Sequence, residues 1–397
     1  MINSSIKCLY VHDHKFKKII ERVYSEGKIT NEVFLRYILH KDELVVLSRI
    51  EEYSECIGLT EITLENIEFL PVRGLNFSRV FSIHLAYNIK HILRQVNNAD
   101  FIVVRLPSFL GIFTLVINIL FKKKYFIEMV GDVEESLIST CKDQDLLKSN
   151  VIYLYRDVNK YFIKKADGVI YVTKKYLQEK YPTKGIMANA SNVEVVVRDI
   201  VVSKADYEIK QENIKIGLIA SFNNHYKGIT EAISAINILN TGEQKIVLHI
   251  LGSGRLKEHY KVLARSLGVE DYIFFDGVLK GGQEVSNWLS SLDLYIQPSY
   301  TEGLPRALIE AMSVGLPAVA TNVGGIPELL PRAALIQPHD SEALAEKIKC
   351  FIDSQSLRFE HGKLNYEKSK EYDKEVLKQR RSQFWKAARE IVKRSAA

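Results

Sequence analysis

Residues 298–330, PSYTEGLPRALIEAMSVGLPAVATNVGGIPELL, constrain the fold more than any other part of the chain. An apolar strand is predicted just before this run at 294–296, a helix from Pro305, and a second strand at 317–320. This order makes one β–α–β unit of a parallel sheet, with its loops at the carboxyl ends of the two strands. Open α/β sheets bind their ligands at that edge.

The predicted helix start offers a site for an anion. Pro305 suits the first helical position, because its missing N–H would have no partner there. The backbone N–H groups from Arg306 to about Leu308 point out of the helix start, where the helix dipole favours negative charge. Glu302 and Glu310 lie on either side of this start. A solvated helix with an Arg306–Glu310 ion pair is the alternative. The paired glutamates, the Glu-Gly-Leu-Pro turn and the Gly-Gly turn together favour a phosphate site.

Strand and helix patterns alternate through the rest of the chain, which indicates an α/β fold built on parallel sheets. In the first half, strands are predicted at 6–11, 44–47, 101–104, 125–130 and 168–172, with helices at 31–40, 79–97, 109–120 and 151–166. In the second half, strands are predicted at 214–220, 245–251 and 272–275, with helices at 228–239, 255–267 and 284–292. The alternation lapses in a polar, charged stretch at 203–213, which we interpret as a linker.

A chain of 397 residues is too long for one ordinary hydrophobic core, so two domains are expected. We predict a first domain at 1–200 and a second domain at 201–375. A basic C-terminal helix at 376–397 is predicted to pack back on the first domain.

Composition and charge exclude several classes of protein. The net charge of +6 is spread along the chain without a basic stripe, so no nucleic-acid partner is predicted. The four cysteines have no paired spacing, which indicates free thiols in a reducing compartment. The N-terminus has no apolar segment typical of a secretory signal. The most apolar run, 109–121, is shorter than the roughly 20 residues that span a bilayer. The expected location is therefore the cytoplasm.

The second half resembles the retaining glycosyltransferases of family 4, whose two-domain fold is called GT-B. Five segments carry the resemblance, in the order of the family: IGLIASFNNHYKG (216–228), LHILGSGRL (248–256), IFFDGVL (273–279), LDLYIQPSYTEGLPRALIEAMSVGLPAVAT (292–321) and GGIPELL (324–330). The Glu-x7-Glu pair beside Glu-Gly-Leu-Pro is specific, whereas a Gly-x-Gly alone would not be. The resemblance implies an α/β fold with two Rossmann-like domains facing across a cleft.

The resemblance also implies that the second domain binds a nucleotide-sugar donor, with no separate cofactor and no bound metal. By position, Glu310 would bind the ribose and Glu302 would approach the donor sugar. The amide groups of Arg306 and Ala307 would meet the diphosphate, and Lys227 would neutralise its charge as it leaves. The other donor contacts implied by position are Ser221, Leu279 (where the base packs), Gly303 and Leu304.

The chain departs from the family pattern in two places. The family pairs its lysine with an arginine five or six residues earlier, where this chain has Phe222 and Ser221. Lys227 is therefore expected to act alone or with a basic residue of the other domain. Many members carry a histidine after the strand that ends here at Gly131, and Asp132 is the nearest polar residue. Asp132 would either contact the sugar or acceptor, or cap the next helix.

The first half resembles the family more weakly. Residues 24–28 correspond to a Gly-rich loop beside the diphosphate and acceptor, with Gly27 as the matching glycine. This half is expected to hold the acceptor. His12 and His14 follow the first predicted strand, and we interpret them as solvated loop residues rather than a metal site or a catalytic base.

We therefore expect a retaining glycosyltransferase that uses a UDP-sugar, or else GDP-mannose. Its acceptor would be a glycan or a lipid-linked glycan of a bacterial surface polysaccharide. The alternatives are a UDP-sugar epimerase of the same fold and an inactive nucleotide-sugar-binding module. The apolar helix at 109–120, followed by three lysines, is either an ordinary buried helix, which we favour, or a patch that contacts the inner membrane.

Overall fold

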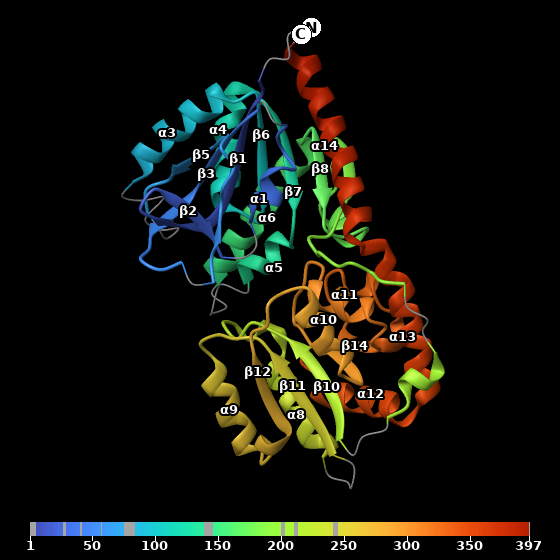
Figure 1. Cartoon of the computed structure of the whole chain (residues 1–397). Helices are drawn as coiled ribbons and strands as arrows, with labels where there is room; N and C mark the ends of the chain where they lie inside the picture. The colour runs from blue at the N-terminus through green and yellow to red at the C-terminus, as the bar shows by residue number, and fades with distance from the viewer. Residues whose placement is uncertain are drawn as a thin grey trace. The chain divides into compact units, whose positions relative to one another are not determined.

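The computed structural model describes residues 5–26, 29–39, 42–56, 58–74, 84–138, 146–199, 203–209, 213–240 and 245–396. The chain divides into two compact units, each built on its own sheet (Figure 1). The first unit consists of residues 1–172, 177–189 and 379–397, and the second of residues 173–176 and 190–378. The units divide near residue 190, whereas the sequence predicts a domain boundary at residue 200.

The first unit is organised around a mostly parallel sheet. Its strands are β1 (Lys7–Ile19), β2 (Arg22–Ser25), β3 (Glu43–Glu52), β4 (Thr60–Glu61), β5 (Ile67–Pro71), β6 (Phe101–Leu106), β7 (Lys124–Met129), β8 (Gly168–Tyr171) and β9 (Ile186–Asn189). β1 lies between β3 and β6 and pairs with both in parallel, while β2 turns back along the end of β1. From β6 the sheet continues through β7 and β8 to β9.

β1 is longer than the sequence predicts. A strand is expected at 6–11 and a polar loop after it, but β1 continues to Ile19, paired with β3 and then with β2. His12 and His14 therefore lie within a strand, which corrects their interpretation as solvated loop residues. His14 Nε2 lies 3.1 Å from Ser25 Oγ of β2. Burial lowers the pKa of His12 well below its usual range.

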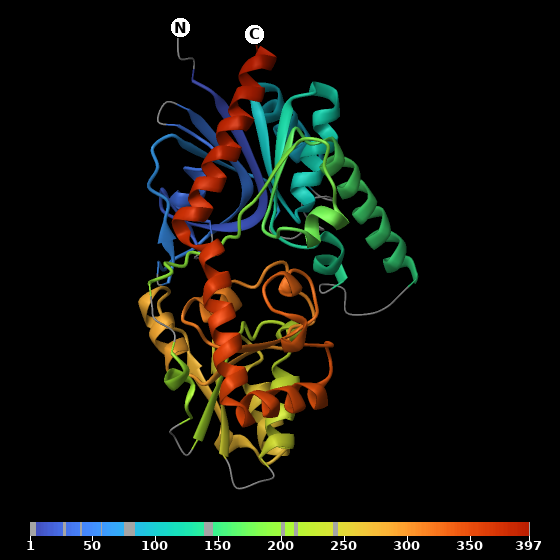
Figure 2. The same ribbon diagram turned by 90° about the vertical axis from the view of Figure 1, so that its right-hand side faces the viewer.

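Helices cover both faces of the first sheet (Figures 1 and 2). One face carries α3 (Leu85–Asn98), α4 (Phe109–Phe121) and α6 (Leu146–Lys165); the other carries α1 (Asn31–Phe34) and the end of α14 (Lys374–Ala396). The predicted helix at 31–40 is shorter than expected. Two short helices, α5 (Val133–Ile138) and α7 (Tyr176–Lys180), follow β7 and β8.

The C-terminal residues of α14 help to close the core of the first unit. The ring of Trp385 lies 6.1 Å from that of Phe126 in β7 and 4.9 Å from that of Tyr37. Arg389 donates to the Asp42 carboxylate and, at 3.0 Å, to Tyr37 O. Figure 2 shows this part of α14, in red, crossing the face of the first sheet.

α4 is buried along one side and exposed at its end. Leu110, Ile112 and Leu115 are buried, whereas Ile119 and Leu120 are 55% and 74% exposed. The buried-helix prediction therefore holds for most of α4 but not for its last turn. Within the described residues, no helix has the length and apolar character needed to cross a bilayer.

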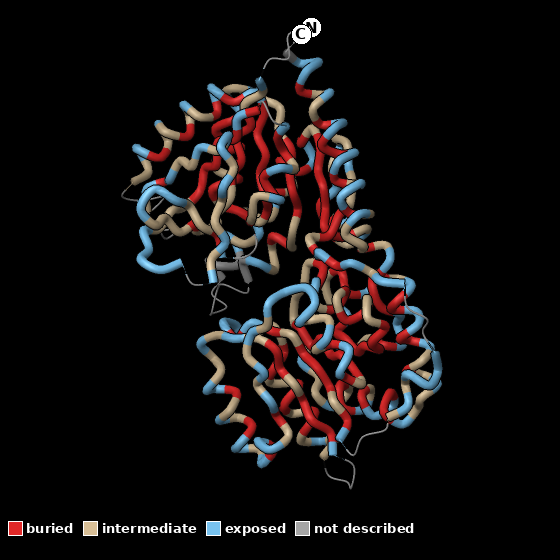
Figure 3. Tube along the Cα trace, viewed as in Figure 1, coloured by how far each residue is buried: buried red, intermediate tan, exposed pale blue. Residues whose placement is uncertain are grey.

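The second unit has a fully parallel sheet. In spatial order its strands are β12 (Ile273–Gly277), β11 (Lys245–Leu251), β10 (Asn213–Ile219), β13 (Leu294–Gln297), β14 (Ala318–Thr321) and β15 (Leu335–Ile336). Its helices are α8 (Ile229–Leu239), α9 (Lys257–Ser266), α10 (Gln283–Ser290), α11 (Arg306–Ser313), α12 (Ser341–Asp353) and α13 (Gln355–Ser369). Figure 3 shows the central strands of this sheet as buried. These elements confirm the alternation predicted for this half of the chain.

The strand order of the second sheet reverses between β10 and β13. From β10 the chain builds β11 and β12 on one side, and then returns to place β13 and β14 on the other side. The loops that leave β10 and β13 therefore run in opposite directions from the same edge. Open α/β sheets bind their ligands at such a reversal.

Candidate functional site

Lys227 and Glu302 meet at the strand-order reversal of the second sheet. Lys227 ends a short 3-10 turn, His225–Lys227, after β10, and Glu302 lies in the loop after β13. Lys227 Nζ donates to Glu302 Oε1 at 2.5 Å, although 75 positions separate the two residues in the chain. The fold thus places both residues where parallel sheets bind ligands.

This ion pair is largely shielded from water. The side chains of Lys227 and Glu302 are 16% and 9% exposed. Burial alone would lower the pKa of Lys227, but the charge and the hydrogen bond of Glu302 outweigh burial and raise that pKa above its usual value. Lys227 is therefore a cation at neutral pH, as a group that neutralises phosphate must be.

Two glycines let the loops around this pair close on one another. Gly228 has a φ of +67°, and a Cβ there would lie 1.9 Å from Pro298 O. Gly324 has a φ of +53°, and a Cβ there would lie 1.7 Å from Glu302 O. Only glycine fits both the positive φ and the close approach. The loops after β10 and β14 therefore both pack directly on the loop that carries Glu302.

α11 begins beside Glu302 with amide groups for which the described part of the chain provides no acceptor. Pro305 is the N-cap of this helix, one residue before its predicted position. The first N–H bonded within the helix is that of Ile309, which donates to Pro305 O at 3.4 Å. The N–H groups of Arg306, Ala307 and Leu308 precede that bond and project from the helix start. Such a helix start binds phosphate groups and other anions.

Glu310, one turn into α11, lines a pocket with a volume of about 340 Å³. α10, α11 and residues 194–198 form the walls of this pocket. Burial raises the pKa of Glu310, and the charge of Arg306 offsets only part of that effect. Arg306 is exposed, and the ion pairs of the described residues do not include one between Arg306 and Glu310. The solvated ion pair considered from the sequence is therefore not formed.

The other predicted donor residues are distributed around the pair. Ser221 is exposed in the loop after β10, and Leu279 is half-buried in the loop between β12 and α10. The backbone N–H of Gly325, in the Gly-Gly turn, donates to Gly303 O at 2.9 Å. Leu304 is buried beneath the start of α11. Gly27 lies outside the described residues.

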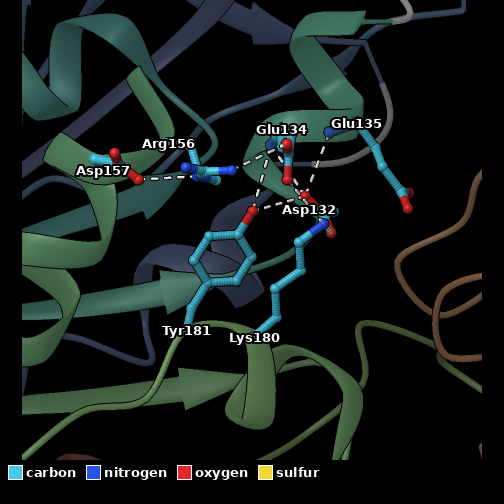
Figure 4. Close-up of polar contacts among 7 residues, drawn as sticks. All are labelled: Asp132, Glu134, Glu135, Arg156, Asp157, Lys180 and Tyr181. Atoms are coloured by element: carbon cyan, nitrogen blue, oxygen red, sulfur yellow. Dashed lines mark hydrogen bonds and ion pairs between the residues drawn. The ribbon is translucent and has the colours of Figure 1, made fainter. Parts of the chain in front are cut away.

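Asp132, in the first unit, caps α5 (Figure 4). Its Oδ1 accepts the N–H of Glu134 at 2.9 Å and that of Glu135 at 3.3 Å. Tyr181 Oη donates to the same oxygen at 2.7 Å, and Lys180 Nζ donates to Oδ2 at 2.6 Å. Of the two interpretations of Asp132, the helix cap is the one observed. A contact of Asp132 with the sugar or acceptor stays a prediction.

The neighbours of Asp132 form a charged cluster that joins three helices. Lys180, from α7, also lies 3.2 Å from the Glu134 carboxylate of α5. Arg156, from α6, lies 3.5 Å from the same carboxylate and 2.9 Å from Asp157. As Figure 4 shows, the cluster ties the segment after β7 to the helices beside it.

The polar residues behind Glu302 are not among the site residues predicted from the sequence. They are Tyr295, Gln297 and Ser299, all fully buried at or just after the end of β13. A signal was present, because alternate positions of a strand share one face. Three polar side chains at alternate positions, in and just after an otherwise apolar strand, indicate a hydrogen-bonded row.

Part of the chain matches a known protein family, and most of it is similar to a known protein. Residues 199–368 match the family model for glycosyl transferases group 1. Protein CapJ from Staphylococcus aureus is 29% identical over 362 residues, which cover 90% of this chain and 89% of CapJ. A putative colanic acid biosynthesis glycosyltransferase, WcaL from Salmonella typhimurium, is 35% identical over 142 residues, 33% of this chain and 35% of WcaL.

A solved structure supports the fold over the whole chain. HepE of Anabaena, in complex with UDP-glucose, matches with a TM-score of 0.62 at 16% sequence identity. The match covers 96% of this chain and all of HepE. Residues 199–368 are thus similar to the group 1 glycosyl transferases, and the chain as a whole has the GT-B fold.

Proposed function

We propose that this protein transfers a sugar from a nucleotide-sugar donor to a glycan or lipid-linked acceptor, with retention and without a bound metal. The Lys227–Glu302 pair beside the start of α11 carries this proposal. A cation, a carboxylate and free amide groups at one edge of a sheet match a diphosphate that is linked to a sugar.

Each group has a separate part in the transfer. The N–H groups at the start of α11 bind the diphosphate, and Lys227 stabilises its charge as the sugar–phosphate bond breaks. Glu302 accepts a hydrogen bond from a hydroxyl of the donor sugar, and Glu310 accepts those of the ribose. The acceptor oxygen bonds to the anomeric carbon on the face that the diphosphate leaves. The departing phosphate oxygen takes the proton of the acceptor hydroxyl, so no side chain is needed as a base.

A UDP-sugar is the favoured donor, with GDP-mannose as the second choice. The complex of HepE with UDP-glucose supports a UDP-sugar in a chain of this fold. The similarity to WcaL, a putative colanic acid biosynthesis enzyme, supports a bacterial polysaccharide as the acceptor. We place the reaction in the cytoplasm, in the synthesis of lipopolysaccharide, capsule or exopolysaccharide.

Thermal unfolding with a panel of UDP-glucose, UDP-galactose, UDP-N-acetylglucosamine and GDP-mannose tests the donor. A donor at about 100 times its Kd is expected to stabilise the protein by about 2.7 kcal/mol. The Glu310→Ala variant should bind that donor about tenfold more weakly by calorimetry, because a hydrogen-bonded carboxylate is lost. Glu346→Ala, an exposed change on α12, is the control. Wild-type affinity in Glu310→Ala would remove Glu310 from the site.

Product analysis separates transfer from the alternatives. With donor alone, an epimerase would release an epimeric nucleotide sugar, and an inactive module would leave the donor intact. With donor and acceptor, the proposal predicts a glycoside whose anomeric configuration, measured by NMR, is that of the donor. A chelator such as EDTA should leave the rate unchanged. A product with inverted configuration, or a rate lost with EDTA, would refute that part of the proposal.

We also propose that the end of α4 makes a peripheral contact with the inner membrane. Val116, Ile119 and Leu120 are exposed at i, i+3 and i+4, and so share one face of the helix. Lysines at 122–124 follow directly, and cations beside an exposed apolar face favour anionic lipid.

Vesicle binding tests this contact. Vesicles of phosphatidylglycerol and phosphatidylethanolamine should sediment the wild-type protein, and the double variant Ile119→Ser, Leu120→Ser should bind several-fold less. Val262→Ser removes an equally exposed apolar side chain from α9 in the second unit and is the matched control. Equal sedimentation of all three proteins would rule out α4 as the contact.

A further inference from the structure

A buried chain of hydrogen bonds ends on one oxygen of Glu302. Tyr295, Gln297 and Ser299 have no exposed surface, although each carries a polar group. Tyr295 and Gln297 lie at alternate positions of β13 and Ser299 two residues after its end, and hydrogen bonds join their side chains in one row. The row leads from the middle of the sheet to the carboxylate that pairs with Lys227.

Every hydrogen in this row has one assignment. Ile219 N donates to Tyr295 Oη at 3.4 Å, and Tyr295 Oη donates to Gln297 Oε1 at 2.9 Å. Gln297 Nε2 donates to Ser299 Oγ at 2.7 Å and to Glu302 Oε1 at 3.2 Å. Ser299 Oγ donates its single hydrogen to Glu302 Oε1 at 2.9 Å. The row therefore runs in one direction, from the β10 backbone to Glu302, and leaves the amide of Gln297 no freedom to flip.

Three donors converge on Glu302 Oε1. They are Gln297 Nε2, Ser299 Oγ and Lys227 Nζ. Within the described ranges, these are the protein hydrogen bonds of the Glu302 carboxylate, and all of them fall on Oε1. Oε2 keeps its lone pairs for another donor. A carboxylate held in this way presents Oε2 at a fixed position.

We propose that Gln297 and Ser299 are positioning residues, which fix the Glu302 carboxylate so that Oε2 accepts a hydroxyl of the donor sugar. This inference rests on the proposed function, because it assigns the sugar contact to one atom. A fully buried polar row is costly unless every member is bonded, and a satisfied row orients the groups at its end. The sugar, rather than the nucleotide, is the part of the donor that depends on this orientation.

The first test compares the best-binding nucleotide sugar of the panel with its nucleoside diphosphate. Gln297→Leu keeps the approximate volume of the side chain. It removes the amide that donates to Ser299 Oγ and to Glu302 Oε1. It should weaken calorimetric binding of the nucleotide sugar about tenfold, and that of the nucleoside diphosphate less than about twofold. Asn365→Leu is the matched control, because Asn365 is a buried amide of the same unit that bonds Leu316 O. It should change neither affinity.

The second test is a double-mutant cycle with Glu302→Ala. If Gln297 acts through Glu302, its substitution should change nucleotide-sugar affinity less than about twofold once Glu302 is absent. A role in folding alone would give the same loss in both backgrounds. Ser299→Ala, which removes only one hydroxyl, repeats the cycle if Gln297→Leu does not fold. Its expected effect is smaller and in the same direction.

The outcomes separate this inference from the proposed function. Equal losses for the nucleotide sugar and the nucleoside diphosphate, or additive effects in the cycle, would overturn the positioning role while the donor assignment stands. A wild-type protein that binds no member of the panel would overturn the proposed function, and the positioning role with it. A loss confined to the nucleotide sugar and absent without Glu302 would establish the role.

Discussion

At the scale of single residues, Lys227 has two demands placed on it. It is bound to Glu302 in the structure, and the proposed reaction also requires it to stabilise a diphosphate. An ammonium group has three N–H donors, so one can stay on Glu302 while another meets phosphate. The pair can therefore persist in the donor complex.

Lys227→Ala should lower turnover more than donor affinity, because the charge that Lys227 stabilises is greatest as the leaving group departs. We expect turnover to fall about 100-fold and the Kd of the donor to rise less than about tenfold. Steady-state rates and calorimetry measure the two quantities. Lys349→Ala, an exposed change on α12, is the control. Unchanged turnover would remove Lys227 from the reaction.

Gly228 is a position where even a small substitution should cost stability. Gly228→Ala adds the strain of a positive φ and a clash with Pro298 O, and should lower the free energy of unfolding by about 3 kcal/mol. Gly268→Ala is a matched control, because Gly268 has a φ of +68° and no atom within 4 Å of its Cβ. It should cost about 1 kcal/mol. Urea unfolding measures the free energy of unfolding of both variants. Equal losses would show that the close contact with Pro298 does not add to the destabilisation.

At the scale of elements, both units place polar groups at the carboxyl ends of parallel strands. In the second unit, the loop after β13 leads into the start of α11. In the first unit, Asp132 follows β7 and caps α5. In the second unit the free amide groups of α11 remain available. In the first unit Asp132 already occupies the amide groups of α5.

Asp132→Ala should destabilise the first unit more than the loss of a simple cap. It removes the cap and leaves Lys180 and Tyr181 without their acceptor, at an expected cost of about 2–4 kcal/mol. Asp340→Ala removes only the cap of α12, where Asp340 accepts from Ala343 N, and should cost about 1 kcal/mol. Chemical denaturation measures both. Similar costs would show that the bonds of Lys180 and Tyr181 contribute little.

At the scale of the whole molecule, each compact unit contains one of the two tryptophans of the chain. Trp385 lies in the core of the first unit, and Trp288 lies in α10 of the second. Variants with a single tryptophan, Trp288→Phe or Trp385→Phe, therefore report the unfolding of each unit by fluorescence.

Arg389→Ala should destabilise the first unit selectively. It breaks the shielded ion pair with Asp42, and removing one partner of such a pair costs about 3 kcal/mol. In single-tryptophan backgrounds, the midpoint reported by Trp385 should fall and that reported by Trp288 should stay. Arg394→Ala, an exposed change in the same helix, is the control. An equal fall of both midpoints would refute selective destabilisation.

The α/β class, the alternation of the second half and the residues of the Glu-x7-Glu segment follow from sequence patterns alone. The strand at 245–251 has its predicted bounds, and α8 begins one residue after its predicted start. These features are local, because periodic apolar positions, glycines and prolines define them within a few residues of one another. The same local rules failed for β1, where polar residues that resemble a loop pair with β3.

Which atoms meet cannot be predicted in this way and follows from the folded chain. Folding brought Lys227 to Glu302 across 75 positions, assigned Asp132 to a helix cap, and placed Gln297 and Ser299 behind one carboxylate oxygen. Strand order and register set these contacts, and both depend on pairing between distant segments. A polar residue at the end of a strand is the same in sequence whether it faces water or a buried carboxylate, and only the packing around it distinguishes the two.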